Sequence, residues 1–433
     1  MAVAGTLIGA GFGVALVQKR DLTETETSSV FYLCICSSFA MAGAMMLAAP
    51  WIAAFFDMPV LAPVSRVLSL AFIISSLGGV HTSLLAKNLQ FAKLARISLS
   101  ASAVSSLVAI FLAWNGWGIW SLVGQNLAAC ATTSLVVWIW SDWRPKLVFN
   151  LFAIAPLFRF GAYIVAADLL ETIFGRIYIL LIGKCYTPAD LGYYSRADST
   201  LALPNSFTSG IINQVAMPLF SAATHDPVLL QKAFRKAMRV TYYVHAPIMA
   251  GLFVAAEPLV LTLYGSQWVP AIPFVRILAF CGLCWLPVTV NYGYLKATGR
   301  SKAYFAAELA KKVLALGAAV LTVRISIFAM VASLIFVTFV AYLITARIAG
   351  GSVKYAGMRQ ILDAWKPLCA ATLMIPVAAS VLLLRDLSPG ALLGAQVLAG
   401  GLFYLLCCRV LNCKEQSEVF GHLQNMLARV ARR

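Results

Sequence analysis

Charged residues are scarce in this 433-residue chain, in which Asp, Glu, Lys and Arg together make up only 11%. A soluble globular domain is about half apolar and carries about a quarter charged residues. Here 61% of the residues are hydrophobic and the mean hydropathy is +0.86. Because a membrane helix needs about 20 apolar residues, the chain is long enough for about a dozen such helices and little else. The composition excludes a soluble enzyme.

Patterns typical of metal sites, disulfide frameworks and barrel strands are also missing. Most of the ten cysteines lie within apolar runs without zinc spacing, and the four histidines are scattered along the chain. We therefore expect no metal and no cofactor. The apolar runs lack the alternation of membrane β-strands, so helices are the only spanning structure that satisfies their backbone groups. The predicted fold is an all-α polytopic membrane helix bundle.

Hydropathy along the chain predicts twelve complete spans and one partial span. The partial span is residues 1–17. The complete spans are residues 30–56, 64–86, 97–114, 119–140, 156–186, 201–222, 237–263, 272–295, 303–323, 327–346, 367–384 and 392–408.

The positive charge is concentrated in alternate connections. The formal net charge is +17, from 33 Lys and Arg against 16 Asp and Glu, and 23 of the 33 cations lie in every second connection or in the C-terminal tail. The intervening connections, such as 57–59, 114–117 and 265–267, are short and nearly free of cations. In a soluble protein this charge would suggest nucleic acid, but here it predicts that the basic loops and the C-terminus are cytoplasmic.

A weak internal repeat divides the chain. Residues 49–50 match 257–258 at an offset of 208, and residues 63–68 match 273–278 at an offset of 210. Duplicated transporter halves leave such self-similarity, with a substrate path between the halves. Residues 156–208 have no counterpart in the first half, so we expect that about 50 residues are missing upstream of Met1.

The repeat and the hydropathy together predict five regions. These are an N-terminal lobe lacking its first helix (1–140), a cytoplasmic inter-lobe linker (141–155), a C-terminal lobe (156–350), two extra helices (351–408) and a cytoplasmic amphipathic tail (409–433).

Four segments carry a family resemblance: residues 13–23 (GVALVQKRDLT), 191–197 (LGYYSRA), 256–260 (AEPLV) and 264–268 (YGSQW). The chain resembles the Wzx-type flippases, the polysaccharide-transporter branch of the multidrug/oligosaccharidyl-lipid/polysaccharide superfamily. The resemblance runs from residue 1 to about 350 and is weaker in the last two spans. One departure is Tyr178, which stands where many relatives carry an acidic or amide residue.

This resemblance implies fourteen helices, arranged as two six-helix lobes plus two. It also implies movement of undecaprenyl-diphosphate-linked oligosaccharide from the cytoplasmic to the periplasmic leaflet of the bacterial inner membrane, for exopolysaccharide or lipopolysaccharide biosynthesis. The implied partners are that lipid-linked substrate, membrane lipids, and a polysaccharide polymerase and chain-length regulator.

Ionisable residues inside spans are costly and are therefore candidates for function. Asp168, Glu171 and Arg176 lie within one span, across about 140° of one helix side. We predict that they line a polar cavity and that Arg176 binds the diphosphate. The alternative is a neutralised cluster that only holds the lobe together.

A second group lies in the cytoplasmic half of its span. Glu308 and Lys312 have the favourable i,i+4 order, with Lys311 beside them. We predict that Glu308, Lys311 and Lys312 capture the lipid-linked diphosphate from the inner leaflet. The alternative is that the lysines only reach toward the membrane surface.

The repeat also relates Arg66 to Arg276, both near the periplasmic ends of their spans. They are candidates for a cationic exit pair, with reaching toward the interface as the alternative. Glu257, also near the periplasmic boundary, is a candidate for gating or ion coupling.

Two other functions remain open from the sequence. A small-molecule antiporter of the same superfamily predicts a cavity dominated by carboxylates. A membrane-embedded polysaccharide polymerase or ligase predicts a large periplasmic loop with catalytic groups. The candidate residues are mostly cationic and no such loop is evident, which favours the flippase.

Overall fold

The computed structural model describes residues 23–88, 90–150, 174–211, 216, 220, 223, 226–352, 355, 357–383, 388–413 and 415–417. Within these residues the secondary structure is helical and contains no strand, which confirms the all-α prediction. The chain divides into two compact units, residues 1–177 and 178–433, which are described separately. The predicted boundaries of the five regions stay predictions.

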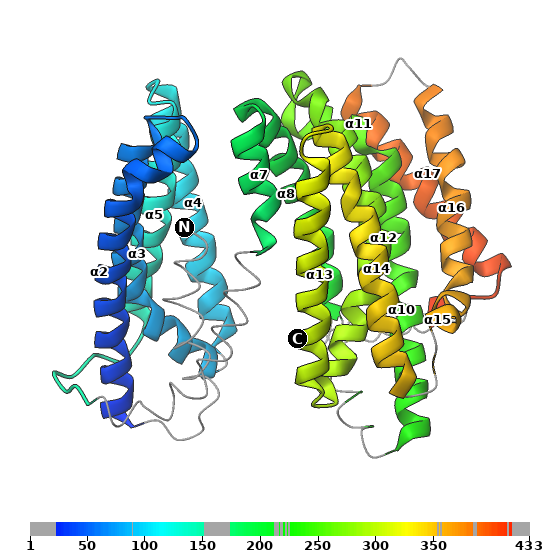
Figure 1. The fold of residues 1–433 in the computed structure, drawn as a ribbon, viewed down its shortest axis with the longest axis horizontal. Helices are drawn as coiled ribbons and strands as arrows, with labels where there is room; N and C mark the ends of the chain where they lie inside the picture. Colours follow the sequence, from blue (N-terminus) through cyan, green and yellow to red (C-terminus); the bar gives the residue numbers. More distant parts are fainter. Residues whose placement is uncertain are drawn as a thin grey trace, which may run out of the picture. The chain divides into compact units, whose positions relative to one another are not determined.

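The described part of unit 1 is a group of four long helices, coloured blue to cyan in Figure 1. Helix α3 contacts both α2 and α5, and α4 packs against α5. A capping box of Thr23 and Glu26 begins the first of these helices. The turn between the last two uses Gly116 and Gly118, both with positive φ. The bounds are α2 Glu24–Phe55, α3 Leu61–Lys87, α4 Phe91–Trp114 and α5 Ile119–Trp140.

Unit 2 is built from the helices coloured green to red in Figure 1. Helix α12 is central, with contacts to α8, α10 and α14, and α16 packs between α10 and α17. The bounds are α7 Ile177–Cys185, α8 Pro188–Ile211, α10 Pro227–Val254, α11 Ala256–Tyr264, η2 Ser266–Ala271, α12 Ile272–Ala297, α13 Ser301–Thr322, α14 Ile327–Ser352, α15 Gly357–Asp363, α16 Trp365–Ser380, η3 Val381–Leu383 and α17 Pro389–Val410.

Several predicted spans match these helices closely, but three differ. Helix α8 begins at Pro188 and not near residue 201, so it includes a polar stretch before the predicted span. The hydroxyl groups of Ser199 and Thr200 donate to backbone carbonyls one turn earlier, which lets these polar residues lie within the helix. The predicted span 237–263 is two helices, α10 and α11, that meet at an angle of 74°. Pro258, four residues after Val254, has no N–H to continue the helical hydrogen bonds. Helices α15 and α16 likewise meet at 58°.

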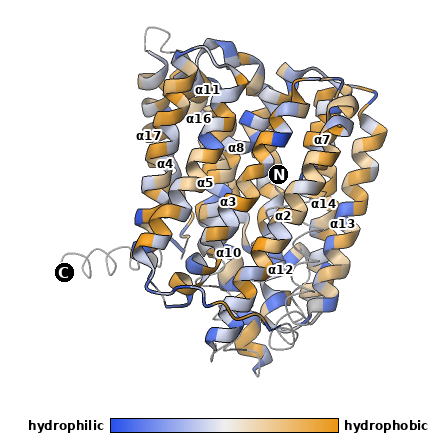
Figure 2. Cartoon of the chain, turned by 90° about the vertical axis from the view of Figure 1, so that its left-hand side faces the viewer, coloured by the Kyte–Doolittle hydropathy of each residue, from blue (hydrophilic) through white to orange (hydrophobic). Residues whose placement is uncertain are grey.

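Seven helices among the described residues are long and apolar enough to cross a membrane, or up to nine if each bent pair is one span. Figure 2 shows apolar residues, in orange, along most of the length of these helices. Helix α13 is also long enough, but Glu308, Lys311 and Lys312 lie near its middle. The described chain is therefore a polytopic membrane protein in which α13 carries charge near its middle.

Each unit has an aromatic core of its own. In unit 1 the ring of Phe31 lies edge-on to those of His81, Trp138 and Trp143. In unit 2 Phe234 stacks on Tyr294, with 4.7 Å between the ring centroids. These clusters fix the helices that carry the charged residues discussed below.

Candidate functional site

Three charged residues near the middle of α13 form one compact cluster. The Glu308 carboxylate lies 3.2 Å from the Lys312 amine and 3.3 Å from the Lys311 amine. The side chains of Lys312, Glu308 and Lys311 are 10%, 15% and 22% exposed. The prediction that these three residues come together is confirmed, while their role in binding stays a prediction.

Tyr292 of α12 is an aromatic neighbour of this cluster, and Tyr304 of α13 lies beside it. The Lys311 amine lies 5.7 Å from the ring centroid of Tyr292, and the Lys296 amine lies 4.4 Å from that of Tyr304. The two tyrosine rings meet edge to face at 5.0 Å. Because both rings are partly buried, they hold the amines of neighbouring turns in a defined place.

The cluster carries an unbalanced charge. Two ammonium groups share the carboxylate of Glu308, so the three side chains have a formal charge of +1. Lys312 lies eleven residues after the start of α13 at Ser301, about 17 Å along the helix at about 1.5 Å per residue. A cation at that depth in a membrane helix costs free energy and is typical of a substrate or ion path.

Two of the three residues predicted near the periplasmic ends of their spans contact each other. Arg276 of α12 lies 3.9 Å from Glu257 of α11, and their side chains are 41% and 53% exposed. Arg66 is exposed near the start of α3 in unit 1. The pairing of Arg276 with Glu257 was not predicted, and an exposed ion pair of this kind contributes at most about 1 kcal/mol.

Arg176 lies at a turn one residue before α7, and its side chain is exposed. Asp168 and Glu171 lie outside the described residues. Tyr178 is buried on α7, and its hydroxyl lies 3.2 Å from the Ser333 hydroxyl of α14. The tyrosine therefore holds α7 against its neighbour.

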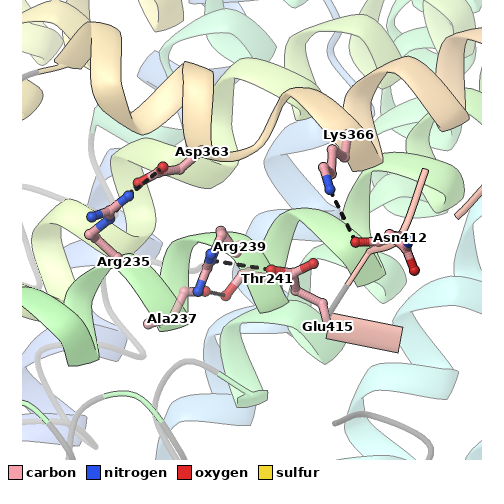
Figure 3. Close-up of polar contacts among 8 residues, drawn as sticks. All are labelled: Arg235, Ala237, Arg239, Thr241, Asp363, Lys366, Asn412 and Glu415. Carbon is pink, nitrogen blue, oxygen red and sulfur yellow. Dashed lines mark hydrogen bonds and ion pairs between the residues drawn. The ribbon is translucent and has the colours of Figure 1, made fainter. Parts of the chain in front are cut away.

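Two other arginines of unit 2 form ion pairs at the end where α10 begins, which we call the basic end (Figure 3). Arg235 donates two hydrogen bonds of 2.7 Å to the Asp363 carboxylate of α15. Its guanidinium also lies 5.7 Å from the ring centroid of Tyr355. Burial raises the pKa of the Tyr355 hydroxyl, so this ring stays neutral beneath the cation.

The same end ties α10 to the last described residues. Arg239 lies 3.2 Å from the Glu415 carboxylate. Lys366 of α16 donates a hydrogen bond of 3.1 Å to the backbone carbonyl of Asn412 (Figure 3). Arg235 and Arg239 are each paired with a carboxylate from another segment, whereas both lysines of the α13 cluster contact the same carboxylate.

Sequence reasoning missed one arginine. Arg196 of α8 lies beside the rings of Tyr264 and Trp268, with its guanidinium carbon 5.0 Å from each ring centroid. The signal was present, because two of the segments that carry the family resemblance contain these residues. Their pairing could not be read from the sequence, since the segments are far apart in the chain.

Residues 1–273 match the family described as "Polysaccharide biosynthesis protein". The chain belongs to this family. Curated relatives carry related names. The chain is 29% identical over 310 residues to the succinoglycan biosynthesis transport protein ExoT of Rhizobium meliloti (strain 1021), a match that covers 72% of this chain and 63% of that protein.

Two further relatives are similar at 25% identity. They are the teichuronic acid biosynthesis protein TuaB of Bacillus subtilis (strain 168), with 70% of this chain and 63% of that protein covered, and the lipopolysaccharide biosynthesis protein WzxC of Escherichia coli (strain K12), with 65% and 58% covered. The chain therefore spans less than two thirds of the length of these relatives.

Solved structures share the fold. A lipid II flippase MurJ structure, in an inward closed conformation, superposes with a TM-score of 0.73 at 15% identity, covering 94% of this chain and 91% of that one. A MATE family transporter of the MOP superfamily gives a TM-score of 0.64 at 14% identity, covering 84% and 87%. At these identities the similarity shows a shared fold and does not identify the transported molecule.

Proposed function

We propose that this chain is a flippase that moves undecaprenyl-diphosphate-linked oligosaccharide units across the bacterial inner membrane by alternating access. It acts as a transporter and not as an enzyme. The basic loops and the C-terminus face the cytoplasm. The proposal is supported by the family, by the names of the relatives ExoT and WzxC, and by a fold shared with a lipid II flippase.

The single observation that carries the proposal is the α13 cluster. A lipid-linked sugar diphosphate keeps its tail in the membrane, but its anionic head needs cations on the way across. Lys311 and Lys312 both contact the carboxylate of Glu308 near the middle of an apolar helix, and these three side chains together carry a formal charge of +1. A bound diphosphate balances that charge.

Arg176 is proposed as another cation that binds the diphosphate of the substrate. Its exposed guanidinium can form two parallel hydrogen bonds to a phosphate, which an ammonium group cannot do. Asp168 and Glu171, on the same predicted span, are proposed to line the path with it.

The test is transport of a fluorescent lipid-linked oligosaccharide in proteoliposomes, where a quencher that cannot cross the membrane reports the outer leaflet. The wild-type chain is expected to exchange the lipid between leaflets. Lys311→Gln together with Lys312→Gln keeps hydrogen bonding but removes both charges, and is expected to slow exchange at least tenfold. Arg176→Gln is expected to slow it severalfold.

The matched control is Lys302→Gln, which removes an exposed lysine from the first turn of the same helix. Its exchange rate should stay near that of the wild-type chain. Unchanged exchange in the double lysine variant, at normal abundance, removes the cluster from the mechanism. Proton-driven export of a cationic dye by a chain that fails to move the lipid overturns the flippase and favours the antiporter.

A further inference from the structure

Two segments that carry the family resemblance meet at the end of unit 2 opposite the basic end. The first lies near the start of α8, and the second joins α11 to η2 (Figure 1). Arg196 from the first segment lies beside Tyr264 and Trp268 from the second, with its guanidinium carbon 5.0 Å from each ring centroid and 6.2 Å between the two centroids. We call these three residues the aromatic–arginine cluster.

Neighbouring contacts hold this cluster in place. The hydroxyl of Thr200, one turn after Arg196, lies 3.0 Å from the hydroxyl of Tyr264. The ring of Tyr193 meets Trp268 edge to face, with 5.9 Å between their centroids. Gly265 has a φ of +89°, which lets the chain turn from α11 into η2 and brings Trp268 over the arginine.

The guanidinium in this cluster is available to a ligand. Arg196 is exposed, and within the described chain it has no carboxylate partner, in contrast to Arg235, Arg239 and Arg276. Stacking against aromatic rings uses the face of a guanidinium and leaves its five N–H donors at the edge. The edge matches the geometry of a carboxylate or phosphate.

The rings around the arginine are only partly buried. Tyr193, Tyr264 and Trp268 have intermediate exposure, so they combine apolar surface with polar edges. Such surfaces suit a pyranose ring, which has apolar C–H faces and polar hydroxyl groups. A single cation beside them matches one carboxylate better than a diphosphate, which carries more than one charge.

We propose that the aromatic–arginine cluster binds a carboxylate-bearing sugar, such as a hexuronate, of the transported oligosaccharide. The guanidinium of Arg196 binds the carboxylate through two hydrogen bonds, and the aromatic edges contact the sugar ring. This rests on the proposed function, because it assigns the cluster to the same substrate. The site makes the transporter selective for units that contain an acidic sugar.

Binding to the detergent-purified full chain tests this by calorimetry, without any transport step. The probes are a glucuronate-containing disaccharide, its neutral glucose counterpart, inorganic pyrophosphate and phosphatidylglycerol. The wild-type chain is expected to bind the acidic disaccharide at least tenfold more tightly than the neutral one. Equal affinity for the two disaccharides overturns the proposal, as does competition by pyrophosphate or phosphatidylglycerol at equal strength.

Variants then assign the binding to Arg196. Arg196→Gln is expected to abolish the preference for the acidic disaccharide, and Arg196→Lys to lose most of it, because an ammonium group lacks the planar fork. Arg324→Gln is the matched control, since Arg324 is an exposed arginine in the turn between α13 and α14 at the same end. A preference that survives Arg196→Gln contradicts the assignment.

Transport separates this proposal from the proposed function. The ratio of exchange rates for an acidic and a neutral lipid-linked oligosaccharide should fall at least tenfold in Arg196→Gln and stay unchanged in Arg324→Gln. If the wild-type chain moves neither lipid, the proposed function fails. If it moves both and Arg196→Gln leaves the ratio unchanged, only the acidic-sugar site fails.

Discussion

The two units use different polar contacts between their helices. In the described part of unit 1 hydroxyl groups make the contacts far from the helix ends: Ser38 meets Ser76, and Ser134 donates to the Ile74 carbonyl. Every Asp, Glu, Lys or Arg of α2 to α5 lies within six residues of a helix end, including Lys93, whose amine donates to the Trp140 carbonyl. In unit 2 charged groups lie within helices, as in the α13 cluster. Both units are apolar bundles, but among the described residues only the second bears charge far from a helix end.

This difference separates packing from function. A neutral hydroxyl that donates to a carbonyl can satisfy itself within its own unit, and many do so one turn earlier on the same helix. Burying a cation in a membrane helix costs free energy even when the cation is paired. Such a cost is typical of a substrate or ion path, so α13 of unit 2 is the better candidate for contacting the substrate.

The largest expected effect comes from breaking the α13 cluster. Glu308→Ala removes the carboxylate that both Lys311 and Lys312 contact. The two neighbouring ammonium groups then repel each other without that carboxylate to screen them. Losing one partner of a buried pair costs about 3–5 kcal/mol, and we expect about 3 kcal/mol because the lysine stems can reach toward water. The melting temperature of the purified protein in detergent measures it.

A matched control exists in the same unit. Glu257→Ala breaks the contact with Arg276. Because both side chains are well exposed, the change should cost less than about 1 kcal/mol of stability. Equal drops in melting temperature for the two variants would show that the α13 cluster is no more buried in solution than a surface pair. The contrast between the units would then lose its main support.

Structural features that depend only on residues close together in the chain could be predicted from the sequence. Continuous apolar runs located the helices, and for α5 both ends agree with the prediction. The contact between Glu308 and Lys312 followed from helical spacing alone, because the two residues are four apart. The predicted span 237–263 was drawn as one helix, since the chain is mostly apolar on both sides of the bend of 74° between α10 and α11.

Contacts between distant segments could not be predicted in this way. Arg276 and Glu257 were predicted as separate candidates, and their pairing depends on how α11 folds back on α12. Arg196 and Trp268 both lie in recognised motifs, yet no spacing rule connects residues on α8 and η2. Tertiary packing decides these pairs, and hydropathy along the chain contains no information about it.

A second, smaller effect concerns the corner between α14 and α15 in unit 2. A Cβ atom at Gly350 would lie 2.1 Å from the backbone carbonyl oxygen of Tyr355 and 3.0 Å from its carbon. Backbone atoms cannot move aside as a side chain can, and the Tyr355 N–H also donates to the Gly350 carbonyl at 2.8 Å. We expect Gly350→Ala to cost about 1–3 kcal/mol.

The adjacent glycine provides the comparison for this corner. Gly351 has nothing within 4 Å of its added Cβ atom. Gly351→Ala should leave the melting temperature unchanged or raise it slightly, because alanine favours the helix by about 0.5–1 kcal/mol. Equal losses for both variants would mean that the tight approach to Tyr355 is absent in the purified protein.

The smallest expected effect tests the neutral contacts of unit 1. Ser134 of α5 donates a hydrogen bond of 2.6 Å to the Ile74 carbonyl of α3, where the two helices come close at Gly78. Ser134→Ala removes this bond but keeps the Cβ atom and the packing. Because hydrogen bonds between membrane helices contribute about 0.6 kcal/mol on average and at most about 1.7 kcal/mol, the melting temperature should fall only slightly.

Ser106→Ala makes the same change at an exposed position of α4 and should have no effect. If Ser134→Ala destabilises the protein as much as Glu308→Ala does, neutral and charged contacts matter equally, and the α13 cluster no longer stands out as the site that awaits an anionic ligand.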